Sequence, residues 1–289
     1  MRITNRMGLP EALVKAVSVK RHNKPGQLSA TTLLNGTKQI LLTDRHWESL
    51  EEDVADRFWA ILGTAVHGLL EHAGENELVE EFVSHDVDGV TVTGRIDNYN
   101  TKTGVVTDYK TVSATRILRQ DFGDWWKQGM IYAWLLRGID LPVSKCRFIS
   151  MIKDHKKRDA ARNPSYPQTP MHVYEFDVAE QGLAEIEAFI ADKVARYKLY
   201  REMTDDDIPP CSPEERWERP SEFAVMKAGL KRAVRKFESR QDADALASEK
   251  GAGHFVETRP GESIRCQDWC ACSGFCNFRR ENVRREGSA

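Results

Sequence analysis

The chain has 289 residues, of which 40% are hydrophobic and 30% are charged, and its formal net charge is −2. This composition indicates a globular protein with a hydrophobic core and excludes collagen-like, low-complexity and mostly disordered chains. No run of 18 apolar residues and no apolar N-terminal segment is present, so we expect neither a membrane-spanning helix nor a secretory signal, and a cytoplasmic location. Because the net charge is close to zero, a nucleic-acid partner would have to be recognised by local patches of charge.

The first 73 residues predict short helices after an irregular start. Residues 1–30 contain Pro10 and a turn at Lys24-Pro25-Gly26, and we expect them to form an irregular lead-in. Ser29 supplies a side-chain oxygen that can cap a short helix over residues 29–34. Apolar residues recur at helical spacing over residues 46–73, which predicts one or two helices.

The hydrophobic period then changes to that of strands. Residues 78–83 and 90–97 predict two strands, and Asp88-Gly89 between them is typical of a hairpin turn. A third strand is expected at 105–110, a helix at 122–137, and further strands at 146–152 and 172–178, separated by a charged loop. A long helix at 179–203 follows. This order predicts an α/β fold with a mixed central sheet flanked by helices.

The chain changes character at the acidic, proline-containing stretch 205–210. Beyond it, short strands at 223–226, 233–237 and 254–258 and a helix near 241–249 predict a small unit, which a cysteine-rich stretch closes. We therefore expect three parts: the lead-in (1–30), a core (31–205) and a small C-terminal cysteine-rich metal subdomain (206–289), whose polar tail is expected to fray.

Two acidic residues and a lysine are predicted to meet at one end of the sheet. Asp97 is expected to end one strand and Asp108 nearly ends its partner, while Lys110 points to the same face as Asp108. Like charges on adjoining strands are destabilising unless a cation compensates them, and carboxylates can hold Mg²⁺. An isolated Asp-x-Lys is a weak signal, because Asp154-His155-Lys156 repeats it in a charged loop. The pairing of Asp97 with Asp108 makes the first copy the stronger candidate.

Three further candidates fall on predicted helices. His67 lies on the helix before the hairpin, with Glu71 one turn later, and Gln128 and Tyr132 share one face of the helix at 122–137. Taken alone, a helical histidine is more often a structural residue, and the Gln-Tyr pair also fits an ordinary helix surface.

The order of these motifs is more specific than any one of them. It runs GxxxH, GxxD, DxK and QxxxY on helix, strand, strand and helix, and it resembles the RecB-type branch of the PD-(D/E)XK nuclease superfamily over residues 60–152. The resemblance implies a PD-(D/E)XK core and a DNA nuclease that depends on Mg²⁺ or Mn²⁺. The implied metal ligands are His67, Asp97, Asp108 and the Tyr109 carbonyl. The resemblance also implies that Lys110 acts on the nucleophilic water and that Gln128 and Tyr132 position DNA phosphate or Lys110.

The cysteines predict a second metal site. Four of the six fall between residues 266 and 276, and in a reducing compartment such clusters are more often metal ligands than disulfides. Cys146, in a predicted core strand, is expected to be a small buried hydrophobe. The spacing is similar to that of the iron–sulfur cysteines of AddB-type nucleases and CRISPR-associated RecB-like exonucleases, which implies a [4Fe–4S] cluster. The implied ligands are Cys211, Cys266, Cys270 and Cys276, with Cys272 as a substitute for Cys270 and zinc as the alternative metal.

Residues 226–237 carry five basic side chains and no acid, and on a two-stranded β ribbon they could contact a DNA backbone or simply form a solvated edge. These side chains are Lys227, Lys231, Arg232, Arg235 and Lys236. Trp125 and Trp126 are candidates either for stacking on single-stranded DNA or for the core.

The resemblance therefore predicts a metal-dependent exonuclease that hydrolyses phosphodiester bonds in single-stranded DNA or at duplex ends, during recombination, repair or phage replication. Chains of this size and motif content resemble phage or mobile-element recombination nucleases. That likeness implies the host cytoplasm and a helicase or single-strand-annealing partner. Two alternatives stay open: a metal-stapled DNA-binding module whose acidic site is inert, and an endonuclease or CRISPR adaptation nuclease.

Overall fold

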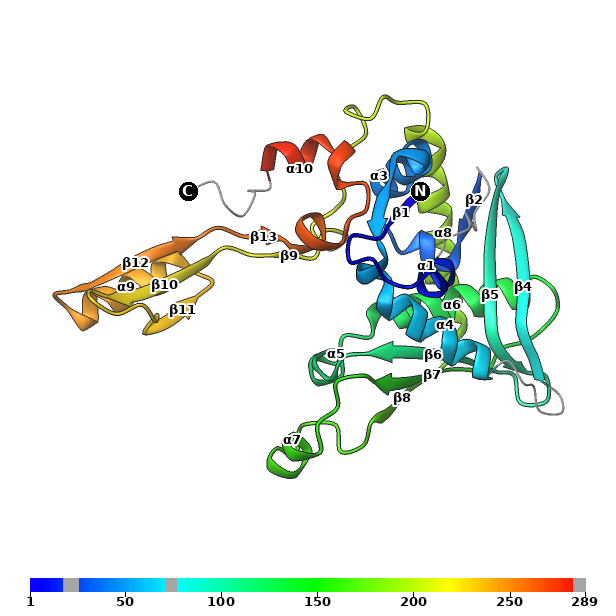
Figure 1. Cartoon of the computed structure of the whole chain (residues 1–289), viewed down its shortest axis with the longest axis horizontal. Helices are drawn as coiled ribbons and strands as arrows, with labels where there is room; N and C mark the ends of the chain where they lie inside the picture. Colours follow the sequence, from blue (N-terminus) through cyan, green and yellow to red (C-terminus); the bar gives the residue numbers. More distant parts are fainter. Residues whose placement is uncertain (18–25, 71–76, 283–289) are drawn as a thin grey trace. The chain divides into compact units, whose positions relative to one another are not determined.

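The computed structural model describes residues 1–17, 26–70 and 77–282, and the chain divides into two compact units, residues 1–203 and 204–289 (Figure 1). The expected turn at Lys24-Pro25 and the residue Glu71 lie outside the described residues. No helix in the described ranges combines the length and the apolar character needed to cross a membrane.

A six-stranded mixed sheet forms the centre of the first unit. Five strands follow one another in space in the order β2, β5, β6, β7 and β8, and β4 pairs with β5 off this path. Their bounds are β2 (Gln27–Ser29), β4 (Glu77–Val87), β5 (Val90–Asn100), β6 (Val105–Val112), β7 (Lys145–Ile152) and β8 (Met171–Asp177). The pairs β2–β5 and β6–β7 are parallel, whereas β4–β5, β5–β6 and β7–β8 are antiparallel. The predicted α/β fold with a mixed central sheet is confirmed.

The β4–β5 hairpin closes through the two residues that the sequence indicated. Asp88 and Gly89 have φ angles of +53° and +76°, which a type I′ turn requires at both central positions. Because such a turn fixes the register of the two strands, it also decides which residues of β4 lie opposite those of β5.

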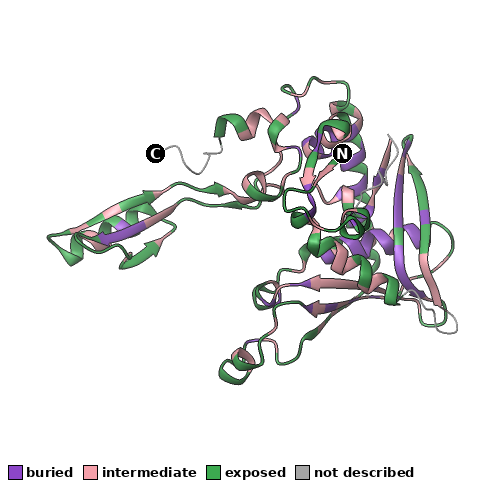
Figure 2. Ribbon diagram, in the orientation of Figure 1, coloured by how far each residue is buried: buried purple, intermediate pink, exposed green. Residues whose placement is uncertain are grey.

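Helices pack against this sheet (Figure 1). The helix α6 (Gly123–Arg137) contacts β4, β5, β6 and β7 as well as α8 (Glu180–Tyr200), and it supplies fully buried side chains such as Met130, Ile131 and Leu135 to the core (Figure 2). The helix α4 (Phe58–Leu70) packs on β6. The shorter helices of this unit are α1 (Glu11–Ala16), α2 (Ala30–Leu33), α3 (Thr37–Arg45), α5 (Ala114–Arg119) and α7 (Lys157–Arg162). As expected, Ser29 caps α2, since its Oγ accepts a hydrogen bond from Thr32 N–H at 3.2 Å.

The N-terminal region is more ordered than the sequence indicated. The strand β1 (Arg2–Thr4) pairs in parallel with β3 (Glu51–Asp53), and β2 belongs to the central sheet. The expectation of an irregular lead-in was therefore wrong for these strands. Residues 46–70 hold β3 and the 3₁₀ turns 47–49 and 54–57 before α4, which confirms one of the helices expected in this region. These short strands depend on partners far along the chain, which a local hydrophobic period cannot reveal.

The second unit contains a small three-stranded antiparallel sheet. Its order is β11 (Arg235–Phe237), β10 (Glu222–Lys227) and β12 (His254–Arg259), and α9 (Arg240–Lys250) packs on it. Residues 226–237 are thus part of a larger sheet than the expected two-stranded ribbon. A two-residue pair, β9 (Glu218–Arg219) with β13 (Glu262–Ser263), leads to the cysteine-rich turns and α10 (Asn277–Asn282). Few side chains are buried here, among them Ala224, Val225 and Ala243 (Figure 2).

Candidate active site

The candidate active site lies where β5 changes partners. Residues 91–93 of β5 pair with β2, and residues 98–100 pair with β6. Asp97 directly precedes the second pairing, so it lies inside β5 and not at the end of the strand as expected. Its Oδ2 accepts a hydrogen bond from Tyr109 N–H at 2.9 Å. A side-chain carboxylate thus occupies the place of the next backbone hydrogen bond between the two strands.

Gly94 allows α6 to approach this part of β5 closely. A Cβ atom at Gly94 would lie 2.7 Å from Leu135 Cδ1 and 3.2 Å from the ring of Tyr132. The absence of a side chain therefore lets Tyr132 and its neighbours on α6 reach the acids of β5 and β6.

Asp108 and Lys110 are held together by Gln128. Lys110 Nζ lies 2.7 Å from Asp108 Oδ2 and donates a hydrogen bond to Gln128 Oε1 at 3.0 Å. Gln128 Nε2 donates to Asp108 Oδ1 at 3.0 Å and to the Tyr132 hydroxyl at 2.8 Å. Both hydrogens of the Gln128 amide and its carbonyl are therefore engaged within the site, which fixes the orientation of the amide.

The carboxyl group of Asp108 is buried, and a positive charge beside it stabilises its ionised form. The residue is 2% exposed, and burial raises the pKa of its carboxyl to about 6 despite the opposing effect of Lys110. Asp108 Oδ2 has the Lys110 ammonium as its partner, at 2.7 Å. A carboxylate oxygen has more than one lone pair, so this atom can also coordinate a metal ion.

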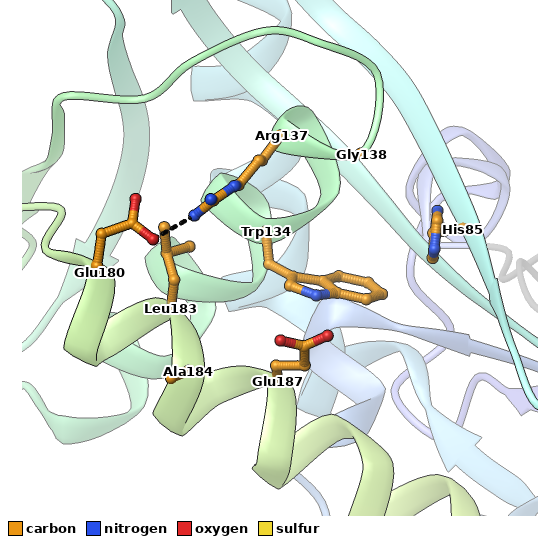
Figure 3. Close-up of a pocket in the computed structure, with 8 residues that line it drawn as sticks. All are labelled: His85, Trp134, Arg137, Gly138, Glu180, Leu183, Ala184 and Glu187. Carbon is orange, nitrogen blue, oxygen red and sulfur yellow. Dashed lines mark hydrogen bonds and ion pairs between the residues drawn. The ribbon is translucent and has the colours of Figure 1, made fainter.

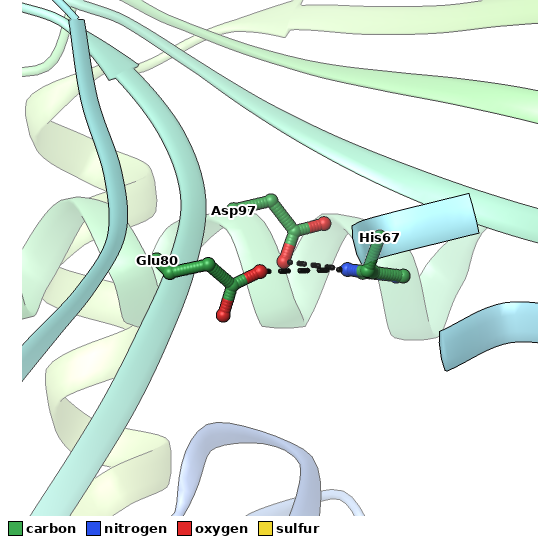
Figure 4. A group of neighbouring side chains, drawn as sticks. All are labelled: His67, Glu80 and Asp97. Carbon is green, nitrogen blue, oxygen red and sulfur yellow. Dashed lines mark ion pairs between the residues drawn. The ribbon is translucent and has the colours of Figure 1, made fainter. Parts of the chain in front are cut away.

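A third acid, which the sequence analysis did not single out, completes the cluster. His67, Glu80 and Asp97 each offer one ligand atom, and these atoms lie within 4.8 Å of one another (Figure 4). His67 Nδ1 is 3.4 Å from Asp97 Oδ1 and 3.8 Å from Glu80 Oε1. The neighbouring Asp97 carboxylate is the main cause of a raised pKa at His67. The three side chains also line a small hollow together with Tyr109.

Glu80 adopts an unusual backbone conformation. Its φ is +52°, and the ladder between β4 and β5 pairs Val79 with Asn98 and Glu81 with Ile96 but leaves out the pair between them. Left-handed backbone is strained for a residue with a side chain and is concentrated at functional sites. A signal was present in the sequence, because two successive acids break the alternation that a strand normally shows at this point.

Three other residues that the sequence analysis considered have structural roles outside the acidic cluster. Asp154, in the second Asp-x-Lys, accepts a hydrogen bond from Ala114 N–H at 2.7 Å and so satisfies the first turn of α5. Trp125 is 3% exposed and stacks on Phe148 at 5.6 Å, which places it in the core and excludes base stacking. Cys146 is buried, as predicted, and its thiol donates to the carbonyl of Gly129 at 3.3 Å.

A larger cavity, of about 330 Å³, opens in the first unit away from these acids (Figure 3). His85, Trp134, Arg137, Glu180 and Glu187 are among the residues that line it. Arg137 is already paired with Glu180 at 2.7 Å, and the cavity contains none of the residues that form the acidic cluster.

Cys266, Cys270, Cys272 and Cys276 lie near one another in the second unit. Cys270 Sγ and Cys272 Sγ are 3.5 Å apart, and this contact is the main cause of a raised pKa at Cys270. Burial, with smaller effects from Cys270 and Cys276, raises the pKa of Cys266 to about 11. Within the described ranges, the acidic cluster is the only place where three potential ligand atoms converge, so the thiols are not gathered tightly around one point.

The basic side chains of residues 226–237 differ in their surroundings. Lys236 pairs with Glu222 at 2.6 Å, and the guanidinium of Arg235 lies over the ring of Phe237 at 4.8 Å. Lys227, at the end of β10, and Lys231 and Arg232, in the turn that follows, are exposed.

The chain is similar over part of its length to several solved structures. Similar chains include SSO0001 (18% identity, TM-score 0.42, covering 63% of this chain and 81% of that chain). The alkaline exonuclease LHK-Exo from Laribacter hongkongensis is 12% identical, with a TM-score of 0.41, and the match covers 61% of this chain and 90% of that chain. A phage-related exonuclease from Haemophilus somnus 129PT is 12% identical, with a TM-score of 0.31, and the match covers 59% of this chain and 75% of that chain. No curated protein sequence matches the chain. The PD-(D/E)XK nuclease superfamily matches residues 12–277, a span that contains both units' candidate sites. Since this match extends over most of the chain, the protein belongs to the PD-(D/E)XK nuclease superfamily.

Proposed function

We propose that the protein is a divalent-metal-dependent deoxyribonuclease of RecB type that removes nucleotides from DNA ends. Membership of the superfamily supports nuclease activity. The observation that carries the proposal is the convergence of Asp97, Glu80 and His67 beside the buried Asp108–Lys110 pair. Arg95 and Lys110 offset part of the negative charge of Glu80 and Asp108, and a bound cation would offset the rest.

The donor set suits Mg²⁺ or Mn²⁺. Asp97, Asp108 and Glu80 offer hard oxygen atoms, which both ions prefer, and His67 offers an imidazole nitrogen that Mn²⁺ accepts more readily than Mg²⁺. The carbonyl of Tyr109 is proposed as a further ligand. When bound, the ion would polarise the phosphoryl group and lower the pKa of a bound water.

Lys110 is proposed to orient the attacking water and to stabilise negative charge that develops on the phosphate. Its ammonium is anchored by two partners, Asp108 and Gln128, and little freedom is left for it to turn away. Gln128 is 4% exposed and both of its N–H groups are engaged, which favours a role in positioning Lys110 over a direct contact with DNA phosphate. Tyr132 supports Gln128 through its hydroxyl.

The cysteines of the second unit are proposed to hold a [4Fe–4S] cluster, with a zinc ion as the alternative. The proposed ligands are Cys211, Cys266, Cys270 and Cys276, with Cys272 as the substitute for Cys270. Cys270 and Cys276 both contribute to the raised pKa of Cys266, which supports their proximity to it. Because thiol pKa values are raised here, metal binding must release protons, and a unit with so small a core would gain stability from it.

The exposed basic residues of the second unit are proposed to bind the DNA backbone. Simultaneous neutralisation of Lys231, Arg232, Arg235 and Lys236 should flatten the dependence of log K on log salt by roughly 0.7 to 0.9 for each phosphate that the variant no longer binds. Lys236, already paired with Glu222, should contribute the least. An unchanged slope would assign the segment to a solvated edge. A role in recombination beside a helicase or an annealing protein rests on the RecB-type order of motifs alone.

One experiment tests the proposed activity and separates the alternatives. Anaerobically purified protein is incubated with Mg²⁺ or Mn²⁺ and three substrates: end-labelled single-stranded DNA, end-labelled duplex, and covalently closed circles. An exonuclease degrades the linear substrates and leaves the circles intact. Cleavage of circles would indicate an endonuclease. Binding of linear DNA without cleavage, in either metal, would indicate a DNA-binding module with an inert acidic site.

A further inference from the structure

The helix α4 is strongly apolar yet lies open to solvent. None of its 13 residues is buried, and two aromatic side chains on its first turn, Phe58 and Trp59, are 54% and 49% exposed. Their rings meet edge to face with centroids 5.1 Å apart. Trp125, by contrast, is 3% exposed. Two adjacent exposed aromatic rings offer a surface on which another molecule can bind.

A lysine is placed over this aromatic pair. Lys153 Nζ lies 3.7 Å from the centroid of the Trp59 ring, and the backbone N–H of Lys153 donates to the carbonyl of Val112 at 2.9 Å. This hydrogen bond fixes the backbone of Lys153 beside β6, a strand of the sheet that carries the acidic cluster. Trp59 is 49% exposed with the ammonium in this position, so a face of the indole that Lys153 does not cover is left for a base.

Two offsets along the chain, one for Trp59 and one for Lys153, estimate how far these residues lie from the acidic cluster. Trp59 precedes His67 by eight residues on α4, which corresponds to about 12 Å. Lys153 lies three residues beyond Ser150, the partner of Lys110 in the β6–β7 ladder, which corresponds to about 10 Å. The two values agree, and they equal the length of about three stacked nucleotides at roughly 3.4 Å each.

The chain that follows Lys153 is rich in exposed cations. Lys156, Lys157, Arg158 and Arg162 are located on and just before α7, and within the described parts of the chain no ion pair engages any of them. Of the two acids in this segment, Asp154 is engaged with the backbone of α5. The side chains of this segment are therefore available to a polyanion.

We propose that Phe58 and Trp59 form a stacking platform for the bases of a single DNA strand whose phosphates are held by Lys153 and the cations of residues 156–162. Aromatic rings interleaved with cations are the combination that binds single-stranded nucleic acid. Bases in an intact duplex are already stacked on one another, so the platform selects unpaired nucleotides about three positions from the metal site, at roughly 3.4 Å for each nucleotide. This inference rests on the proposed nuclease function and names its preferred substrate as single-stranded DNA.

The test measures binding apart from cleavage. All proteins carry Asp108→Asn, and the affinity for a single-stranded oligonucleotide, for an abasic strand of equal length and for a blunt duplex is measured by fluorescence anisotropy without metal. Base stacking predicts that Trp59→Ala weakens binding of the oligonucleotide about 5- to 150-fold, with little effect on the abasic strand or duplex. Trp59→Phe should recover most of the affinity. Trp217→Ala is the matched control, since Trp217 is 50% exposed and belongs neither to the platform nor to the proposed basic contacts at residues 227–236.

The outcomes separate this inference from the proposed function. An unchanged oligonucleotide affinity in Trp59→Ala, or an equal loss for the abasic strand, would overturn the stacking platform. A base-dependent loss supports it, even if the wild-type protein cleaves no DNA and the proposed activity fails. If Trp59→Ala does not fold, as judged by circular dichroism, the double variant Lys157→Ala, Arg158→Ala replaces it. The salt slope for the single strand should then fall by about 0.7 for each phosphate released, and an unchanged slope would overturn the inference.

Discussion

Replacing Asp108 by asparagine is expected to stabilise the metal-free protein while it abolishes DNA cleavage. Asp108 is 2% exposed, and burial raises the pKa of its carboxyl to about 6 from an ordinary value of 3.8. Asparagine has nearly the same shape, and its oxygen can still accept the hydrogen bond from Gln128 Nε2. It lacks the charge that the folded protein tolerates poorly and that a metal ion requires.

The magnitude follows from the difference between the two pKa values. Below about pH 4 the carboxyl is protonated in both the folded and the unfolded chain, and its ionisation costs no stability. Between about pH 4 and pH 6 the folded protein binds more protons than the unfolded chain, so stability falls as the pH rises. Above about pH 6 the full difference of about two pKa units applies, which corresponds to roughly 3 kcal/mol as an upper value. At about pH 8 the asparagine variant should recover part of this free energy, because its amide nitrogen replaces Oδ2 beside the Lys110 ammonium and offsets some of the gain. At about pH 4 it should recover little.

Urea denaturation in EDTA at about pH 8 and about pH 4 measures this effect directly. We expect a higher midpoint for Asp108→Asn than for wild type at the higher pH and similar midpoints at the lower pH. Added Mn²⁺ should stabilise the wild type and not the variant, because only the wild type keeps the full set of ligands. If the variant is equally or less stable than wild type at the higher pH in EDTA, the burial of Asp108 carries no electrostatic cost and the argument for a cation at this carboxylate is refuted.

Three further predictions concern the chemistry of the two sites. Lys110→Ala should lower kcat by about 10² or more in an end-labelled cleavage assay while DNA binding persists, whereas Lys156→Ala should keep its kcat and at most bind DNA more weakly. An active Lys110→Ala beside an inactive Lys156→Ala would show that the catalytic Asp-x-Lys is the second copy. Glu80→Gln should weaken Mn²⁺ binding measured by calorimetry, and an unchanged affinity for Mn²⁺ would show that Glu80 is not a metal ligand. Cys276→Ser should lose bound metal in anaerobic preparations analysed for iron and zinc, whereas Cys272→Ser should retain about four irons per chain. A single zinc with no iron in wild-type protein would rule out the cluster.

The features that the sequence predicted correctly are those that depend on local chemistry. Asp88-Gly89 specifies a turn through its own backbone preferences, and the two-residue period of a strand places Asp108 and Lys110 on one face. The same holds for Gln128 and Tyr132, which are one helical turn apart and hydrogen-bond to each other. For these residues, position in the chain nearly determines position in space.

The features that were missed depend on pairing between distant segments. Nothing near Arg2 indicates that it will lie beside Glu51, because the parallel pairing of β1 with β3 joins segments that are far apart in the chain. Glu80 belongs to the acidic cluster only because the hairpin register sets it opposite Asp97 and the backbone turns there. Trp59 and Trp125 look alike as sequence, yet one is exposed and the other is a core residue, since burial is decided by how the helices pack on the sheet.

The two oxygens of Asp97 have separate partners, and this division bears on how relatives of this protein could lose activity and remain folded. Oδ2 receives the backbone N–H of Tyr109 where the two strands meet, whereas Oδ1 faces His67. An asparagine at this position would keep an acceptor for the backbone while its amide nitrogen faces the imidazole and repels a cation. An alanine would instead leave the N–H of Tyr109 without its partner. Relatives that have lost catalysis are therefore expected to carry asparagine and not alanine at position 97, because asparagine keeps the hydrogen bond that joins β5 to β6.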